Sequence, residues 1–317
     1  MNPHTARPLK IGLGLPTFEG TMAGVTPGWH DLKRMAQHAE AVGFDSVWVP
    51  DHLIFDPGDP GVPPLGVWEC WSLVASLAAV MTRAEIGTLV ACASFRNPAL
   101  LAKTADTIDE ISGGRLILGL GAGYQEPEYE AFGYPFDHLV GRFEESLKII
   151  HTLLREGSID FQGQYYTTRD CELRPRGPTR TGPPILIGAR PDKPRALRLT
   201  AQYAGYWNIF AVNQVEKILP ALAAVDSACM KAGRDPATLQ RTVTLLVDLP
   251  GSESTKAGGL ANYRASRTPA TGRPEELAEL LRDIARSGVS HVQIFLEPST
   301  MAGIDAFAPT LALLDGG

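Results

Sequence analysis

In the run VWVPDHLIF, residues 47–55, an acid and an imidazole stand side by side directly after an apolar stretch. Asp51 and His52 can both accept and pass on a proton, and the charge of histidine changes near neutral pH. The alternative is structural, with Asp51 capping a turn and His52 lying at a rim. The elements around the pair decide between these uses.

A second chemical signal is the basic segment GARPDKPRALR, residues 188–198. Gly188 lets the backbone approach a ligand closely, and Pro194 suits the first turn of a helix. Free N–H groups at a helix amino terminus attract anions, and Arg190 and Lys193 add positive charge. The segment predicts a phosphate-binding loop, with the solvated start of a basic helix as the alternative.

A third signal is GLGAGYQEPE, residues 119–128, where glycines stand at 119, 121 and 123. Their spacing does not match the dinucleotide fingerprint GxGxxG. They could instead form a flat strand end against which a planar ring lies, or simply a tight turn.

Metal and hydrolase chemistry finds little support in the sequence. The histidines show no HExxH spacing, the four cysteines form no CxxC pair, and there is no GxSxG elbow. We therefore predict no metal site and no disulfide framework, and we expect a reducing, cytoplasmic compartment.

Eight short apolar runs alternate with helix-like runs along the chain. This alternation predicts a parallel sheet covered on both faces, and eight units in about 300 residues favour a (β/α)8 TIM barrel over an open doubly wound sheet. We expect a single domain, 1–317, with an insertion around residues 156–183 in which FQGQYY forms a hairpin. The expected strands are residues 10–16, 46–50, 85–93, 115–121, 184–189, 205–210, 242–249 and 291–297.

Because barrel enzymes form their sites at the carboxyl ends of the strands, this fold would bring all three signals to one face. The net charge of -6 offers no basic field for nucleic acid or an anionic membrane surface. No apolar run reaches the roughly 20 residues of a membrane span, and the first ten residues lack the apolar core of a signal peptide. We therefore expect a small-molecule substrate as the partner, and neither nucleic acid nor a membrane.

Several segments together resemble the bacterial-luciferase-like superfamily. They are GFDSVWVPDHL (43–53), ISGGRLILGLGAG (111–123), YAGYWN (203–208) and GVSHVQIFLEP (288–298). Relatives that are flavin monooxygenases often carry EHH where this chain has DHL, which points to the deazaflavin-dependent oxidoreductases.

The resemblance implies a barrel with coenzyme F420 lying across the carboxyl ends of the strands. In relatives, a non-proline cis peptide in the third strand presses on the deazaflavin ring, and that bond matches Leu89-Val90 here. The remaining implied contacts are Ala122 and Gly123 with the ring system, and Gly188, Ala189 and Arg190 with the phosphate end of the tail.

The resemblance also implies the catalytic residues. His52 would lie near the reactive carbon of the cofactor and assist proton transfer, Asp51 would anchor the cofactor or a loop, and Glu126 is a further candidate acid. Known sugar-phosphate dehydrogenases of this type carry an acid where this chain has Tyr124, and an aromatic residue where it has Asp56. Both departures argue against a sugar-phosphate substrate and leave the proton partner open.

The first hypothesis is therefore an F420-dependent oxidoreductase acting on an alcohol or on an activated C=C or imine bond. The alternatives are an FMN-dependent monooxygenase on the same barrel, a protein that binds the cofactor without turnover, and a hydrolase using Asp51, His52 and Glu126 around a metal. A homodimer is expected by analogy only. The candidates for an apolar substrate wall are Phe55, Trp68, Phe95 and Tyr124.

Overall fold

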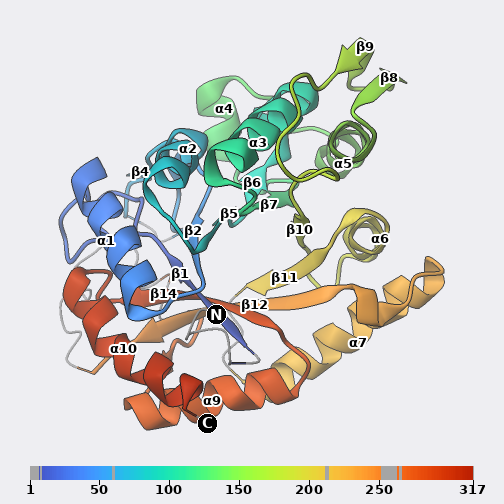
Figure 1. Ribbon diagram of the computed structural model, residues 1–317. Helices are drawn as coiled ribbons and strands as arrows, with labels where there is room; N and C mark the ends of the chain where they lie inside the picture. Colours follow the sequence, from blue (N-terminus) through green and yellow to red (C-terminus); the bar gives the residue numbers. More distant parts are fainter. Residues whose placement is uncertain are drawn as a thin grey trace.

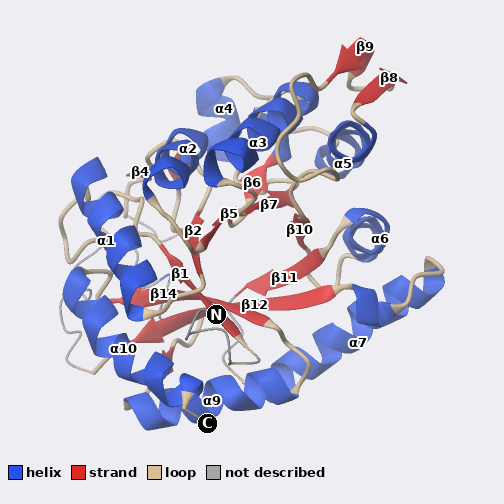
Figure 2. Cartoon of the chain, in the orientation of Figure 1, coloured by secondary structure: helices blue, strands red, loops and turns tan. Residues whose placement is uncertain are grey.

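The computed structural model describes residues 7, 9–58, 61–210, 214–250, 263 and 266–316. It shows a closed ring of parallel strands surrounded by helices (Figures 1 and 2). Each strand of the ring pairs with the next one along the chain, β7 pairs with β10, and the last strand pairs with the first. The predicted (β/α)8 barrel is confirmed.

The eight predicted strands are all present, and the third is broken in two. The barrel strands are β1 (Lys10–Gly14), β2 (Ser46–Val49), β5 (Glu85–Thr88) with β6 (Ala91–Cys92), β7 (Leu116–Gly121), β10 (Ile185–Gly188), β11 (Tyr206–Phe210), β12 (Gln240–Asp248) and β14 (His291–Glu297). The two-residue strand β13 (Ala270–Thr271) pairs with the end of β12.

The helices begin and end where capping residues require. Asn97 accepts hydrogen bonds from the first turn of α3, and Gly43 takes the left-handed conformation that ends α1. The helices are α1 (Trp29–Val42), α2 (Cys70–Val80), α3 (Pro98–Ser112), α4 (Glu126–Phe132), α5 (Leu139–Glu156), α6 (Pro194–Tyr203), α7 (Val215–Lys231), α9 (Pro274–Arg286) and α10 (Met301–Asp315), with short 3₁₀ turns at Ala93–Phe95 and Pro236–Thr238.

The main core lies between the strands and the surrounding helices. Ile11, Leu13, Val47 and Val49 on the first two strands are fully or almost fully buried there. None of the helices in the described ranges combines the length and the apolar character that crossing a membrane requires.

The barrel interior contains a polar layer at the amino ends of the strands. His291 Nε2 lies 2.7 Å from Ser46 Oγ, which also accepts a hydrogen bond from Trp48 Nε1 at 2.7 Å. A Cβ at Gly12 would lie 2.4 Å from Trp48 Nε1, so only glycine leaves room for this indole. Burial lowers the pKa of His291 to about 3, so the ring is neutral in the folded chain.

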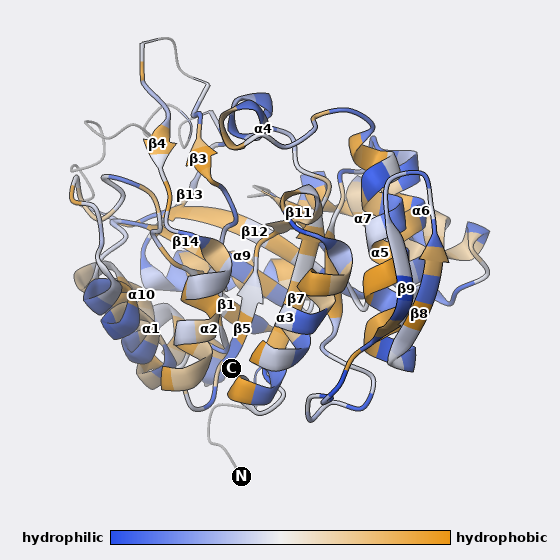
Figure 3. Cartoon of the chain, turned by 90° about the horizontal axis from the view of Figure 1, so that it is seen from above, coloured by the Kyte–Doolittle hydropathy of each residue, from blue (hydrophilic) through white to orange (hydrophobic). Residues whose placement is uncertain are grey.

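The insertion expected around residues 156–183 holds the predicted hairpin. Strands β8 (Ser158–Gln162) and β9 (Thr167–Glu172) pair antiparallel with each other and lie beside α5, outside the barrel ring (Figure 3). A second small hairpin, β3 (Ile54–Phe55) with β4 (Leu65–Gly66), was not predicted. Figure 3 shows it with α4 at the end of the barrel away from the two termini.

Candidate active site

A cavity of about 850 Å³ opens at the carboxyl ends of the strands. This volume suits a cofactor with a small substrate, and its lining is mostly apolar. Of the residues chosen from the sequence, those that line it are Asp51, His52, Leu89, Val90, Ala122, Gly123, Gly188, Ala189 and Arg190. Glu126 is exposed in the first turn of α4 and is not among the lining residues.

Asp51 belongs to a buried ion pair at the end of β2. Its carboxylate accepts hydrogen bonds from the Cys92 backbone N–H at 2.9 Å and from Arg96 Nη2 at 3.0 Å. Arg96 also donates to Glu69 at 2.7 Å. Burial raises the pKa of the Asp51 carboxyl, and the guanidinium opposes that rise. Asp51 thus ties β2 to β6 and to the start of α3.

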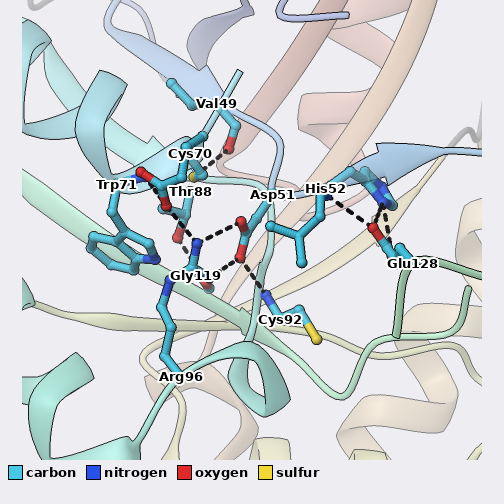
Figure 4. Close-up of polar contacts among 12 residues, drawn as sticks. Val49, Asp51, His52, Cys70, Trp71, Thr88, Cys92, Arg96, Gly119 and Glu128 are labelled. Carbon is cyan, nitrogen blue, oxygen red and sulfur yellow. Dashed lines mark hydrogen bonds and ion pairs between the residues drawn. The ribbon is translucent and has the colours of Figure 1, made fainter. Parts of the chain in front are cut away.

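His52 has a different partner, although it is the next residue. Its Nδ1 lies 3.2 Å from Glu128 Oε1, and the other oxygen of Glu128 accepts a hydrogen bond from the Leu53 backbone N–H at 3.0 Å. Glu128 is only 2% exposed. Figure 4 shows Asp51 with Arg96 and Cys92 on one side of the strand end, and His52 with Glu128 on the other.

Glu128 is therefore the carboxylate at the imidazole, whereas Glu126, the further candidate acid, is exposed and outside the cavity lining. Both residues stand in α4, which the sequence did not predict. Nearby, Gln125 accepts a hydrogen bond from the Asp56 backbone N–H at 3.1 Å and donates to the Asp56 carbonyl at 2.8 Å. The segments after β2 and β7 are thus joined at two points, which fixes the position of His52.

The third strand breaks at the predicted place. The Leu89-Val90 peptide bond is cis, and it separates β5 from β6. A Cβ at Gly121 would lie 2.8 Å from Val90 Cγ2, so glycine there makes room for the valine side chain. Leu89 and Val90 both line the cavity.

The turn after β7 is held in place by Tyr129 of α4. The Tyr129 hydroxyl donates to the Ala122 carbonyl at 3.0 Å, and the Cys92 sulfur lies 3.0 Å from that hydroxyl. Gly123 has φ of 79°, and a Cβ there would lie 1.9 Å from the Tyr129 oxygen. Burial raises the pKa of the Cys92 thiol to about 12, so it is a neutral hydrogen-bonding group here.

The basic segment after β10 forms the opposite end of the cavity. Arg190 and Lys193 lie beside Asp192, at 3.0 Å and 3.6 Å. Arg195 and Arg198 both pair with Glu144, at 2.6 Å and 2.7 Å. These are four cations against two carboxylates, so the segment keeps a positive charge of two.

Two of the four candidate wall residues line the cavity. Phe55 and Tyr124 do, at 5.0 Å and 5.8 Å from the His52 ring. Phe95 is buried against Tyr129, and Trp68 is half exposed at the rim, where its indole donates to the Pro27 carbonyl.

Among the lining residues that the sequence reasoning missed are Phe18, Tyr263 and Arg267. Each lies in a segment that follows a barrel strand, so a search of every such segment for aromatic and basic residues would have raised them. The metal-dependent alternative has no matching set of ligands among the described residues. Within the described ranges, no three His, Cys, Asp or Glu side chains are grouped so that they could hold an ion.

Comparison with known sequences agrees with the resemblance. Pyrimidine monooxygenase RutA of Cronobacter sakazakii is 36% identical over 174 residues, which are 53% of this chain and 50% of that protein. The F420-dependent glucose-6-phosphate dehydrogenase of Amycolatopsis mediterranei is 35% identical over 186 residues, 56% of this chain and 51% of that one. The chain spans about half the length of the curated relatives it matches.

Solved structures show the same fold at low identity. An F420-dependent secondary alcohol dehydrogenase, in complex with an F420-acetone adduct, aligns with a TM-score of 0.79 and 19% identity, covering 96% of this chain and 99% of that one. The monooxygenase RslO1 from Streptomyces bottropensis aligns with a TM-score of 0.74 and 20% identity, with the same coverage.

A family model decides the wider classification. The model described as luciferase-like monooxygenase matches residues 9–249, which run from the first barrel strand to the end of β12. Since this match covers well over half of the sequence, the chain belongs to the luciferase-like monooxygenase family.

Proposed function

We propose that the chain is an oxidoreductase that uses coenzyme F420 to transfer a hydride to or from a small organic substrate. The observation that carries this proposal is the His52–Glu128 pair. An imidazole faces the cavity beside the broken third strand, and a buried carboxylate fixes one of its nitrogens.

The residues at the cavity floor fit a flat cofactor. Ala122, Gly123, Gly188 and Ala189 carry no side chain larger than a methyl group, and all four line the cavity. The side chain of Val90 fills the space beside Gly121. A planar ring system could therefore lie against backbone and small apolar groups, with the Leu89-Val90 segment beneath it.

The charge at the other end of the cavity supports a deazaflavin. F420 carries a phosphodiester and a tail of carboxylates, whereas FMN carries one phosphate. The segment from Arg190 to Arg198 keeps a net positive charge after its pairs with Asp192 and Glu144 are counted. Exposed ion pairs of this kind cost little to rearrange around an incoming anion.

Each residue at the imidazole end has a role that follows from its contacts. When bound, the cofactor supplies the hydride chemistry, and the protein supplies position and electrostatics. His52 holds or moves a proton at Nε2, because its Nδ1 faces Glu128. Glu128 orients the ring, as a carboxylate behind a catalytic histidine does. Asp51 positions the strand end through Arg96 and Cys92.

An FMN-dependent monooxygenase is the second candidate. The observation that favours it is the 36% identity to a pyrimidine monooxygenase over half of the chain. The same cavity would serve, and the difference would be the dependence of turnover on oxygen. A third candidate, binding without turnover, predicts that His52 can be replaced at no cost to any reaction.

Equilibrium titration of the purified protein with F420 and, separately, with FMN tests the proposal. Quenching of tryptophan fluorescence at fixed salt would report binding. Tight binding of F420 with weak binding of FMN is the expected result. Preferential binding of FMN would overturn the proposal in favour of the monooxygenase, and binding of neither would remove both.

A further inference from the structure

The cavity has a corner lined by aromatic rings next to His52. The Phe18 and Phe55 rings are 5.1 Å apart, Phe55 is 5.0 Å from His52, and Tyr263 is 5.3 Å from Phe55. Tyr124 meets His52 at 5.8 Å with its ring plane perpendicular. We call these five residues the ring corner; all of them line the cavity.

Arg267 stands at the edge of this corner. Its guanidinium carbon lies 4.0 Å from the centroid of the Tyr263 ring and 5.7 Å from that of Phe210. A guanidinium stacked on a ring by its face keeps the N–H donors of its edge for a planar acceptor. A carboxylate is the acceptor that this geometry matches best.

Arg267 differs from the other cations of the cavity wall in its partners. The other lining cations, Arg190, Lys193 and Arg195, each lie within 4 Å of a carboxylate. Among the residues that the structure describes, no carboxylate forms an ion pair with Arg267, whose contacts are the two rings. A cation at the wall of an apolar cavity attracts an anionic ligand strongly, because little water screens it.

Three of the four carboxylates that line the cavity are held by the partners named next, and the fourth, Glu297, is buried at the end of β14. Glu19 accepts from the Gly66 backbone N–H, Asp51 from Arg96, and Glu128 from the Leu53 N–H. They are thus held in place by the contacts of the folded chain.

We infer that the ring corner and Arg267 bind a planar, conjugated substrate that carries one carboxylate, with the ring among Phe18, Phe55 and Tyr263 and the carboxylate on Arg267. Aromatic walls select flat apolar ligands, since offset and edge-to-face packing both need a planar partner. A sugar would instead require several polar groups, which these side chains supply poorly. The inference deepens the proposed function, because the ligand would be the substrate of that site.

Calorimetric titration with 2-naphthoate and 2-naphthamide tests the inference. The two probes have the same ring and nearly the same size, and they differ in charge. We expect the wild-type protein, loaded with whichever of F420 or FMN it binds, to prefer naphthoate by about tenfold or more, as a charge-assisted pair would give. Arg267→Gln should remove the preference and leave naphthamide binding unchanged.

Two further variants serve as controls. Arg286→Gln removes the same charge from the exposed face of α9, outside the cavity, and should keep the preference. Arg267→Lys retains the charge and should keep part of it. If Arg267→Gln does not fold, the comparison of the two probes in the wild-type protein still decides.

Equal binding of the two probes by the wild-type protein would overturn the inference. It would also fail if Arg267→Gln weakened F420 or FMN binding and left naphthoate binding intact, since Arg267 would then serve the cofactor. Failure of the proposed function looks different. In that case FMN binds in preference to F420, or neither cofactor binds, while the preference for naphthoate persists in the FMN-loaded or the cofactor-free protein.

Discussion

Asp51 and His52 are neighbours in the chain, but the structure assigns them to two separate regions. The side chain of Asp51 enters a buried cluster with Arg96 that joins β2 to β6 and α3. That of His52 turns to the cavity and meets Glu128 from α4. One cluster joins strand ends and the start of a helix, and the other places an imidazole on the cavity wall, where we propose that it transfers a proton. Adjacent polar residues at a strand end therefore need not share a function.

The difference follows from strand geometry. Asp51 and His52 follow β2, and successive side chains of a strand point to opposite sides, which agrees with their contacts to different partners. The side chains that each of the two residues contacts then decide its role. Arg96 neutralises a carboxylate that is fully buried, and Glu128 leaves the other nitrogen of His52 for a ligand. We therefore expect mutations in the Asp51 cluster to change the free energy of unfolding, and mutations at His52 to change turnover.

Replacement of His52 should give the largest effect, and in catalysis alone. His52→Ala should lower turnover about 100-fold or more, as expected when a general acid or base is lost. F420 binding and the free energy of unfolding should change little. Turnover would be followed by F420 absorbance with a panel of secondary alcohols and enones. The control is His38→Ala, which removes a partly exposed histidine of α1 that pairs with Asp305 of α10 and lies outside the cavity lining.

If His52→Ala left turnover intact, His52 would have no role in proton transfer, and the His52–Glu128 pair would be structural like the Asp51 cluster.

Removal of Arg96 should act on stability. In Arg96→Ala the Asp51 carboxylate stays buried without its cation, and we expect a loss of about 3 kcal/mol in the free energy of unfolding. Urea denaturation measures it. The matched control is Arg286→Ala, whose pair with Glu279 is more than half exposed on both sides, so that its loss should change the free energy of unfolding little. Equal losses in the two variants would contradict a structural role for the Asp51 cluster.

His291 shows what a purely structural histidine does. Its pKa is about 3 in the folded chain, against about 6.5 in an unfolded one. Between these values the unfolded chain binds a proton that the folded chain does not, so stability falls as the pH is lowered from 6.5. Between pH 7 and pH 5 this group should remove about 2 kcal/mol.

Comparison of the unfolding free energies of wild type and His291→Gln across this range measures that contribution. The variant should show the shallower dependence on pH. Parallel curves for the two proteins would mean that His291 is not the group responsible.

The smallest effects should separate two acids of one helix. Glu128→Gln should lower turnover about tenfold, because the amide can still orient His52 but carries no charge to stabilise its protonated form. Glu126→Gln should leave turnover unchanged, since Glu126 is exposed and lies outside the cavity lining. Steady-state rates of the two variants, measured side by side, test the assignment. A larger loss in Glu126→Gln would reverse it.

The sequence predicted the barrel well, because the period of apolar residues and the caps are local signals. All eight expected strands are present, the third in two pieces, and the cis bond at Leu89-Val90 followed from the family resemblance. Helix α4 was missed. It has seven residues, too few to show a clear period.

The partners of the two polar residues could not be predicted. Glu128 lies 76 positions from His52 in the chain, and Arg96 lies 45 positions from Asp51. Such pairs depend on how the loops after different strands pack, and no local pattern records that. For the same reason the ring corner, built from loops after several strands, became visible only in the folded chain.

A structure of the protein with F420 bound would decide the role of the cavity. We expect the deazaflavin ring in the 850 Å³ cavity against Leu89-Val90, with the tail at Gly188–Arg190 and Nε2 of His52 facing the ring. F420 found elsewhere, or a ring that lies away from His52 with Asp51 as its nearest polar contact, would contradict this expectation.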